Sequence, residues 1–162
     1  MEEAHGFRVV AWWASGRTGI AKSSSAANVI HFTSPPAFGG VDGRWTPEDL
    51  LLSALAACYT TTLRTLAEGS RFDCTDLQVE VEAAIAKADQ GYRFGEVLIR
   101  VSLTISHEEE RSRALELLNK AKDLCLVSRA LAVEQRFEAH VYTGKSPVKS
   151  GQELPASADT VA

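Results

Sequence analysis

The start of the chain carries the short apolar patterns of a strand meander. FRVVAWWA (Phe7–Ala14) is rich in β-branched and aromatic residues, and SGRTG (Ser15–Gly19) supplies the residues of a turn. NVIHFT (Asn28–Thr33) alternates between apolar and polar positions, as a half-buried strand does. We therefore expect antiparallel strands here, followed by a loop, Ser34–Arg44, that holds two prolines and three glycines.

A long helix is predicted after this loop. Thr46 can act as its N-cap, Pro47 suits the first helical position, and Asp49 completes a shortened capping box. Apolar residues then recur at three- and four-residue steps until Gly69, so the helix should cover 47–67. Two adjacent apolar stripes imply that this helix is buried on most of its sides. The stripes consist of Leu51, Leu55, Cys58, Thr62 and Leu66, and of Leu52, Ala56, Tyr59 and Leu63.

The second half of the chain predicts a long hairpin, two helices and a final strand. Leu77–Ala88 and Arg93–Ile105 both alternate cleanly and are separated by a turn. Ser106 precedes Glu109 by three residues, which is a capping-box spacing at the start of an amphipathic helix. The last two elements are a short helix and a strand, at Cys125–Ala132 and Arg136–Thr143.

The order of these elements, βββ-α-ββ-αα-β, gives an α+β fold class with meanders and hairpins in place of βαβ crossovers. The sequence has no internal repeat and no long linker, so we expect a single domain over residues 1–145. Residues 146–162 are rich in Pro, Ser, Gly and Ala and should form a flexible C-terminal tail.

Composition and charge narrow the function classes. The chain has 162 residues, of which 45% are hydrophobic and 23% charged, and a net charge of −4 with scattered basic residues, which argues against a nucleic-acid partner. No run approaches the ~18 apolar residues of a membrane span, and the N-terminus lacks a signal-peptide pattern. We therefore expect a cytoplasmic protein with no membrane partner. Thiols are normally kept reduced in that compartment, so a disulfide among the three cysteines would be transient and catalytic and not structural.

Cys58 is the first candidate for chemistry. It lies in the middle of the long helix among Ala56, Ala57 and a run of threonines, small residues that leave room for a ligand or a second sulfur. Free cysteines are often buried core residues, so an inert thiol is the competing interpretation. A reactive thiolate would need a cationic neighbour, because a thiol with a pKa near 8.5 is only about 3% ionised at pH 7.

The other candidates each have a structural alternative. Arg17 lies at a strand-to-strand turn, where it could be a solvated turn residue, and Glu48 already has a role as a first-turn helix acid. Cys125 could be a helix-start thiol with a mildly lowered pKa and no partner. Since 67 residues separate it from Cys58, the spacing alone says nothing about whether the two thiols are close. Cys74 lies in a loop without comparable context and is interpreted as incidental.

The four histidines offer no metal site. His5, His31, His107 and His140 are dispersed, and none pairs with a cysteine at a ligand spacing. The sequence contains no glycine-rich phosphate loop. We therefore expect neither a metal nor an organic cofactor.

Three segments of the chain resemble one known family. FGGVDGRWTPEDLLLSALAACYTTTLRTLAE, YRFGEVLIRVSLTIS and LCLVSRAL stand in the order and at the spacing of the OsmC/Ohr family of thiol-dependent peroxidases. The similarity covers essentially residues 7–142. Its most specific parts are Pro47-Glu48 at the start of the long helix, Cys58 in AACY and Cys125 in CLVS.

The resemblance implies an OsmC-like fold and a mechanism with named roles. Cys58 would be the peroxidatic thiolate that becomes a sulfenic acid, and Cys125 would resolve it as an intramolecular disulfide. Arg17 would stabilise the thiolate and orient the peroxide while Glu48 holds that arginine, and Arg44 is the alternative arginine. The implied substrates are organic hydroperoxides, with hydrogen peroxide reduced less well. The implied reductant is an external thiol or dithiol, of lipoyl type in the family's precedent.

Helix geometry adds the expectation of a homodimer. Glu48 and Cys58 are ten residues apart on one helix, about 15 Å along its axis, so they cannot line one compact site. A second copy packed antiparallel to the first would bring its Glu48 end to the thiol, and the apolar girth of the helix fits such burial. The family's intertwined homodimer, with two sites at the interface, agrees with this expectation.

One departure and two rival interpretations accompany the resemblance. In the family the resolving cysteine is commonly followed by proline, which fixes the backbone, whereas Leu126 follows Cys125 here. A redox sensor or small-ligand binder of the same fold would consume about one peroxide per chain, whereas a peroxidase turns over many. A stable dimer with inert buried thiols would react with no thiol reagent in the absence of denaturant.

Overall fold

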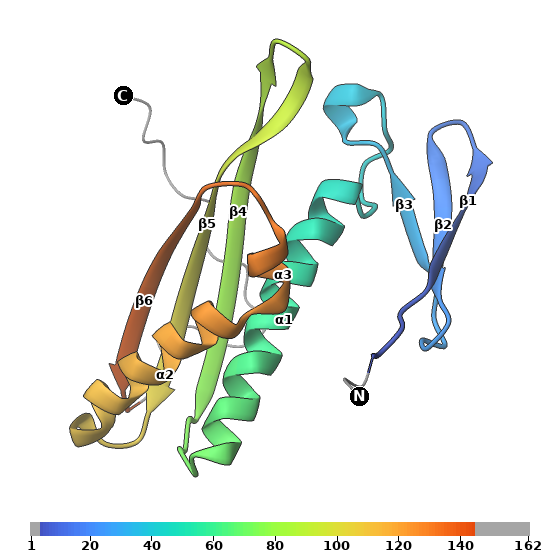
Figure 1. Ribbon diagram of the computed structural model, residues 1–162. Helices are drawn as coiled ribbons and strands as arrows, with labels where there is room; N and C mark the ends of the chain where they lie inside the picture. Colours follow the sequence, from blue (N-terminus) through green and yellow to red (C-terminus); the bar gives the residue numbers. More distant parts are fainter. Residues whose placement is uncertain (1–3, 145–162) are drawn as a thin grey trace. The chain divides into compact units, whose positions relative to one another are not determined.

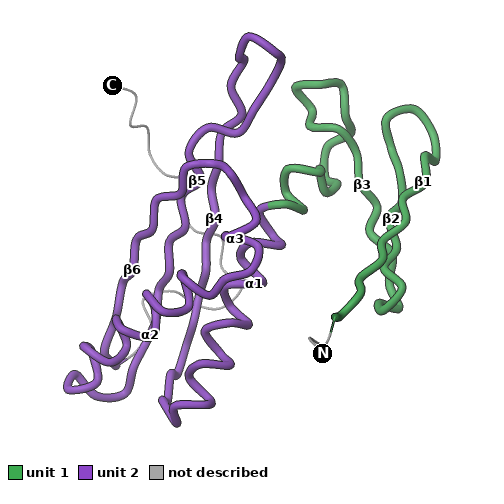
Figure 2. Tube along the Cα trace, viewed as in Figure 1, with its two compact units in different colours: residues 1–51 green, residues 52–162 purple. Residues whose placement is uncertain are grey.

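The computed structural model describes residues 4–144, which form two compact units divided between Leu51 and Leu52 (Figure 2). The order of strands and helices along the chain is the predicted one (Figure 1). The division falls within the long helix α1 (Pro47–Gly69). The predicted C-terminal tail, 146–162, lies outside the described residues. The expectation of a single domain over residues 1–145 stays a prediction.

The first unit contains a three-stranded antiparallel sheet, as its apolar pattern predicts. Its strands β1 (Val9–Ser15), β2 (Thr18–Ser23) and β3 (Ile30–Thr33) pair in chain order. Gly16 has a positive φ of 52° in the tight turn between β1 and β2, a conformation that favours glycine. The predicted loop after β3 contains one turn of 3-10 helix, η1 (Pro36–Phe38).

The start of α1 has the predicted cap. The Asp49 N–H donates to the Thr46 hydroxyl at 3.1 Å, and the Thr46 N–H donates to the Asp49 carboxylate at 2.9 Å. These two reciprocal bonds form a capping box in which aspartate replaces the longer glutamate. Pro47 takes the first helical position, where its missing N–H leaves no carbonyl unpaired.

One stripe of α1 is buried within the chain. Leu55, Tyr59, Leu63 and Ala67 recur at four-residue steps and are each at most 1% exposed. The expected burial on most sides is therefore not seen in a single copy of the chain. The length and apolar composition of α1 are those of a helix that could cross a membrane, contrary to the expectation from the sequence. The core helix of a soluble protein can have the same length and composition, and the buried stripe of α1 packs into the core.

The second unit is built on a three-stranded sheet of mixed direction. β4 (Asp76–Ala88) and β5 (Gly91–Ile105) form the predicted antiparallel hairpin. β6 (Gln135–Thr143) pairs with β5 in parallel, because α2 (Arg111–Leu124) and α3 (Leu126–Ala130) return the chain to the end of the sheet at which β5 begins. The expectation of hairpins without βαβ crossovers is wrong for this last connection.

The start of α2 also differs from the prediction. One turn of 3-10 helix, η2 (Glu108–Glu110), precedes α2, and its cap residue His107 makes no side-chain capping bond. The capping box predicted for Ser106 and Glu109 therefore does not cap α2. The spacing of these two residues suits a cap, but it carries no information about an extra turn before the helix.

The core of the second unit lies between one face of its sheet and the helices α1 and α2 (Figure 1). Alternate residues of each strand point to this face. Burial of each such apolar side chain stabilises the unit by about 1.5–3 kcal/mol. The central strand β5 contributes most, through five residues that are at most 2% exposed: Val97, Ile99, Val101, Leu103 and Ile105.

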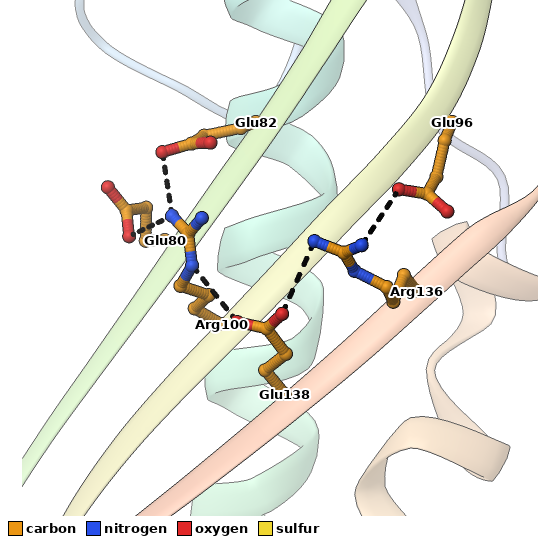
Figure 3. A network of polar contacts seen from close by, with 6 residues as sticks. All are labelled: Glu80, Glu82, Glu96, Arg100, Arg136 and Glu138. Carbon is orange, nitrogen blue, oxygen red and sulfur yellow. Dashed lines mark hydrogen bonds and ion pairs between the residues drawn. The ribbon is translucent and has the colours of Figure 1, made fainter. Parts of the chain in front are cut away.

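The other face of this sheet carries a polar network (Figure 3). Arg100 of β5 lies between Glu80 of β4 and Glu138 of β6 and contacts each carboxylate at 3.1 Å. It also contacts Glu82 at 2.7 Å. The network is completed by Arg136 and Glu96. These half-exposed pairs favour the observed register of the three strands, each by less than about 1 kcal/mol.

Candidate functional site

Cys58 lies midway along α1, beside its buried stripe. The side chain is half-buried and packs against the core of the second unit. Because Cys58 directly precedes Tyr59, it is rotated by about 100° from the buried stripe, onto the flank of the helix. A rigid helix thus holds a thiol that is still in contact with solvent.

Cys125 lies at the junction of α2 and α3. Its backbone is extended (φ −61°, ψ 110°), so the chain changes direction there and does not continue one helix. The side chain is fully buried, at 0% exposed. Its sulfur accepts hydrogen bonds from the N–H groups of Ser128 and Val127, in the first turn of α3.

The structure brings the two sulfurs into contact, although 67 residues separate them in the sequence. The Cys125 thiol donates a hydrogen bond to the Cys58 sulfur. The same sulfur accepts hydrogen bonds from the N–H groups of Leu126 and Val127 and from the Thr62 hydroxyl. Four donors therefore converge on Cys58, three of them from the α2–α3 junction.

The pKa values of the two thiols are shifted in opposite directions from that of an ordinary thiol. Burial raises the pKa of Cys58, but the four hydrogen bonds, led by that of the Val127 N–H, lower it more, so this pKa lies below that of an ordinary thiol. Burial also raises the pKa of Cys125. The Ser128 N–H lowers it, but the hydrogen bond to the Cys58 sulfur and the charge of Cys58 raise it further, so this pKa lies above that of an ordinary thiol. Cys58 is therefore the member of the pair that ionises first, and Cys125 stays protonated as its donor.

Tyr59 ties together the helices that carry the two thiols. Its buried hydroxyl donates to the Leu118 carbonyl of α2 at 2.8 Å, and its ring packs on Phe137 of β6 with centroids 5.6 Å apart. Burial and the nearby Cys125 both raise the pKa of this phenol, so the hydroxyl stays protonated and keeps donating. Since Tyr59 follows Cys58, this anchor also fixes the rotation of α1 at the thiol.

Gln135 anchors the short helix α3 to the sheet. At the start of β6, its side-chain NH₂ group donates to the Ser128 carbonyl at 2.9 Å, and its side-chain oxygen pairs with the Ser128 hydroxyl at 2.5 Å. Ser128 also supplies an N–H to the Cys125 sulfur. The N–H groups that point at the two sulfurs are thus held in place by a side-chain contact from β6.

Arg17 lies at the β1–β2 turn of the first unit. Its side chain is exposed, and its guanidinium donates to the Phe38 carbonyl at the end of η1. Gly39, which follows η1, has a positive φ of 78°, a conformation that favours glycine. Arg44, the alternative arginine, lies on the wall of an open groove in the same unit. A role for either arginine at the Cys58 thiol stays a prediction.

Glu48 lies in the first turn of α1, where its charge complements the helix dipole. Its carboxylate oxygen Oε2 is buried and has no hydrogen-bond partner among residues 4–144. A buried oxygen that stays without a hydrogen bond lowers the free energy of unfolding by about 1–3 kcal/mol, and by more when it is charged. The predicted pairing of Glu48 with an arginine would supply the missing donor.

Cys74 has a contact that sequence reasoning missed. Arg64 of α1 donates to the Cys74 sulfur at 3.0 Å and pairs with Glu68 at 3.4 Å. A cation of the kind expected beside Cys58 thus lies beside the cysteine interpreted as incidental. The sequence carries no signal for it, because the end of α1 and a loop separate Arg64 from Cys74.

Two adjacent thiols of unequal acidity define the chemistry of this site. The more acidic thiol can act as a nucleophile, and the second can then form a disulfide with it because the sulfurs are already in contact. Within the described part of the chain, no three His, Cys, Asp or Glu side chains are grouped to hold a metal ion.

Leu126→Pro tests the N–H donors at the α2–α3 junction. Cys125 already has the extended backbone that a following proline requires, and proline suits the first helical position, so the turn can keep its shape. Loss of the Leu126 N–H should raise the pKa of Cys58 and slow its alkylation at pH 7 by about fivefold. Iodoacetamide labelling measures this on the tryptic peptide Trp45–Arg64, in which Cys58 is the sole cysteine.

Leu126→Ala is the matched control for this variant. The Leu126 side chain is 68% exposed, and alanine keeps the N–H, so the alkylation profile should follow that of the wild type. If Leu126→Pro folds normally and also keeps the wild-type profile, this N–H does not act on the Cys58 sulfur.

Comparison with known proteins gives the family. A family model described as OsmC-like protein matches residues 40–139. The uncharacterized protein YmaD of Bacillus subtilis (strain 168) is 28% identical over 145 residues, which cover 86% of this chain and 97% of that protein.

Solved structures share the fold at low sequence identity. An OsmC-like protein of unknown function from Vibrio cholerae O1 biovar eltor superposes with a TM-score of 0.75 at 14% identity, over 84% of this chain and 99% of its own. An organic hydroperoxide resistance protein from Elizabethkingia anophelis gives 0.70 at 22% identity, over 89% and 100%. The organic hydroperoxide resistance protein OhrB of Bacillus subtilis gives 0.61 at 23% identity, over 85% and 98%. Since the family model spans more than half of the sequence and the fold agrees, the chain belongs to the OsmC-like protein family.

Proposed function

We propose that this protein is a thiol-dependent peroxidase that reduces organic hydroperoxides, and hydrogen peroxide less well, through Cys58 and Cys125. The observation that supports it most is the contact between two thiols whose pKa values shift in opposite directions. Proteins of the same fold are named organic hydroperoxide resistance proteins. The cytoplasm is the compartment that suits this chemistry, because thiols are kept reduced there.

The proposed reaction has two steps on the protein. The Cys58 thiolate attacks the terminal oxygen of the hydroperoxide; the S–O bond forms, the O–O bond breaks, and the alkoxide takes up a proton and leaves as the alcohol. The Cys125 sulfur then attacks the sulfenic sulfur of Cys58; the S–S bond forms, the S–O bond breaks, and hydroxide leaves as water with the Cys125 proton. An external thiol or dithiol reduces this disulfide by exchange and is itself oxidised.

The unequal acidities favour this order of steps. A lowered pKa gives Cys58 more thiolate at neutral pH, which makes it the nucleophile. The pKa of Cys125 is raised mainly by burial and further by the charge of Cys58. Once Cys58 is a neutral sulfenic acid, that charge is gone and Cys125 loses its proton more easily. The resolving thiol thus becomes more reactive only after the first step.

A second copy of the chain completes the site in this proposal. Glu48 and Cys58 are about 15 Å apart along α1, so Glu48 does not reach the thiol of its own helix. In an intertwined homodimer, the Arg17 guanidinium of one copy would orient the peroxide at the Cys58 of the other. The Glu48 carboxylate would hold that guanidinium through charge-assisted hydrogen bonds.

Two features of the described residues support the homodimer. Large apolar side chains are exposed in the first unit, among them Phe7 at 90%, Trp13 at 78% and Trp45 at 51%, and such exposure is typical of an interface. The buried Oε2 of Glu48 lacks a donor among residues 4–144, as expected of an atom whose partner belongs to another copy. The sides of α1 that stay exposed in one copy would be covered in the same dimer.

Cys125→Ser separates the two proposed steps. One equivalent of cumene hydroperoxide should lower the mass of the reduced wild type by about 2 Da, the two hydrogens lost when Cys58 and Cys125 form a disulfide. In Cys125→Ser it should leave a sulfenic acid on Cys58 that dimedone traps. Mass spectrometry of the tryptic peptides locates both products.

Turnover with excess dithiol distinguishes a peroxidase from a redox sensor. The wild type should consume many equivalents of hydroperoxide, and Cys74→Ser should do the same because Cys74 has no part in the proposed steps. Consumption that stops at about one equivalent would favour the sensor. Unmodified Cys58 in both the wild type and Cys125→Ser would contradict the proposed function.

Mixed dimers test whether one site draws on two chains. Cys58→Ser should abolish turnover, and Glu48→Ala should lower it by about tenfold or more. In a purified heterodimer of these two variants, one site combines the intact Cys58 of one chain with the intact Glu48 of the other. Its turnover should return to about half that of the wild type. Turnover no higher than half that of the Glu48→Ala homodimer would mean that Glu48 serves the thiol of its own chain.

A further inference from the structure

The first residue of β6 breaks the alternation of its strand. The later core-facing positions are apolar: Phe137, Ala139 and Val141. Gln135 occupies the core-facing position before them and is paired with Val97 of β5, which is 2% exposed. A polar side chain that starts from the core-facing side of a sheet costs free energy unless it is hydrogen-bonded. Gln135 therefore needs a polar partner in the segment that covers this end of the sheet.

Ser128 of α3 is this partner, and its two bonds require one orientation of the amide. A carbonyl oxygen can only accept, so the Gln135 NH₂ group is the one that lies 2.9 Å from the Ser128 carbonyl. The amide oxygen then accepts from the Ser128 hydroxyl at 2.5 Å. Two bonds between one planar amide and one residue fix the direction of the contact as well as its length.

The Gln135–Ser128 pair acts on Cys125 through the first turn of α3. The Cys125 carbonyl accepts the Arg129 N–H at 3.1 Å, and this bond closes the turn in which Ser128 lies. Cys125 is 0% exposed, and its extended backbone leads directly into the same turn. A displacement of Ser128 would therefore also displace the buried thiol.

The sheet holds the other end of the pair. β6 is paired with β5 from Gln135 onward. The ring at the next core-facing position, Phe137, packs on Tyr59 of α1 with centroids 5.6 Å apart. Gln135 thus connects the turn that carries Cys125 to the strand that contacts the helix of Cys58.

We propose that Gln135 is a positioning residue for the resolving thiol, which through Ser128 holds the Cys125 sulfur where it can attack an oxidised Cys58. This inference rests on the proposed function. In the step concerned, the S–S bond forms, the S–O bond of the sulfenic acid breaks, and hydroxide leaves as water with the Cys125 proton. Gln135 acts mainly on this step, because attack on the peroxide uses one sulfur whereas resolution needs two sulfurs in line.

Slow resolution has a product that can be measured. A sulfenic acid that is not resolved attacks a second hydroperoxide, which leaves as the alcohol while the sulfenic acid becomes a sulfinic acid. The fraction of Cys58 that becomes sulfinic acid is set by the competition between this reaction and resolution. The fraction is measured on chains that have reacted, so a smaller amount of active protein does not change it.

Five variants test the proposal. Gln135→Leu removes both bonds and places an apolar side chain at a core-facing position, and Ser128→Ala removes the hydroxyl. The double variant combines these two changes, and Ser128→Thr keeps the hydroxyl. Glu134→Gln, at the exposed neighbouring position, is the matched control. Circular dichroism and thermal melting confirm that each variant folds.

Each reduced protein is mixed with excess cumene hydroperoxide at a concentration that converts the wild type mostly to the disulfide. Mass spectrometry then separates the disulfide, about 2 Da lighter than the reduced protein, from the sulfinic acid, about 32 Da heavier. Loss of the reduced protein with time gives the rate of the first oxidation.

In Gln135→Leu we expect the sulfinic fraction to be about tenfold higher than in the wild type, while the first oxidation slows by less than about threefold. Ser128→Ala should raise the fraction in the same direction, whereas Ser128→Thr and Glu134→Gln should stay within about twofold of the wild type. The double variant should not exceed the larger single effect, because both changes remove the same contact.

Two results would overturn the proposal. One is a folded Gln135→Leu with the sulfinic fraction of the wild type. The other is a double variant in which the two effects multiply, since Gln135 would then not act through Ser128.

Failure of the proposed function is a separate outcome, in which the wild type does not react with the hydroperoxide. Equilibration of each protein in a glutathione redox buffer then tests Gln135 by itself. The effective concentration of the two thiols should be about tenfold lower in Gln135→Leu than in the wild type. An unchanged effective concentration would contradict the positioning role.

Discussion

The hydrogen bond from the Cys125 thiol to the Cys58 sulfur is the interaction on which the rest of the site depends. It exists because the packing of α1, α2 and the sheet brings a helix flank and a chain junction together. Tyr59 fixes one side of this arrangement by its bond to the α2 backbone, and Gln135 fixes the other by its bonds to α3. The packing of the core therefore determines how the two thiols lie relative to each other.

The asymmetry of the pair follows from its surroundings, because both groups are thiols. Cys58 is half-buried and receives four hydrogen bonds, which stabilise its anion more than burial destabilises it. Cys125 is fully buried and faces the charge of its neighbour, so its proton is retained. The backbone and hydroxyl donors thus favour a thiolate at Cys58 and a protonated thiol at Cys125. An arginine of a second copy would add to a thiolate that is already favoured.

Local patterns in the sequence predict the elements well, because capping and alternation are local effects. The Thr46–Asp49 box and the β4–β5 hairpin are confirmed in this way. The parallel direction of β6 was missed, since alternation is the same in either direction and the path of the helices decides it. The contact between Cys58 and Cys125 and that between Arg64 and Cys74 arise from tertiary packing, which spacing does not encode. The resemblance to a family pointed to the first contact and not to the second.

Cys58 is the thiol of the pair that ionises first. Alkylation of the reduced wild type without denaturant, followed from pH 5 to pH 10 on separate tryptic peptides, measures this order of ionisation. Cys58 lies in Trp45–Arg64 and Cys125 in Asp123–Arg129, so each thiol is followed by itself. We expect the alkylation of Cys58 to have its midpoint at a lower pH than that of Cys125. A Cys58 that titrates at or above Cys125, or that stays unlabelled until denaturant is added, would contradict it.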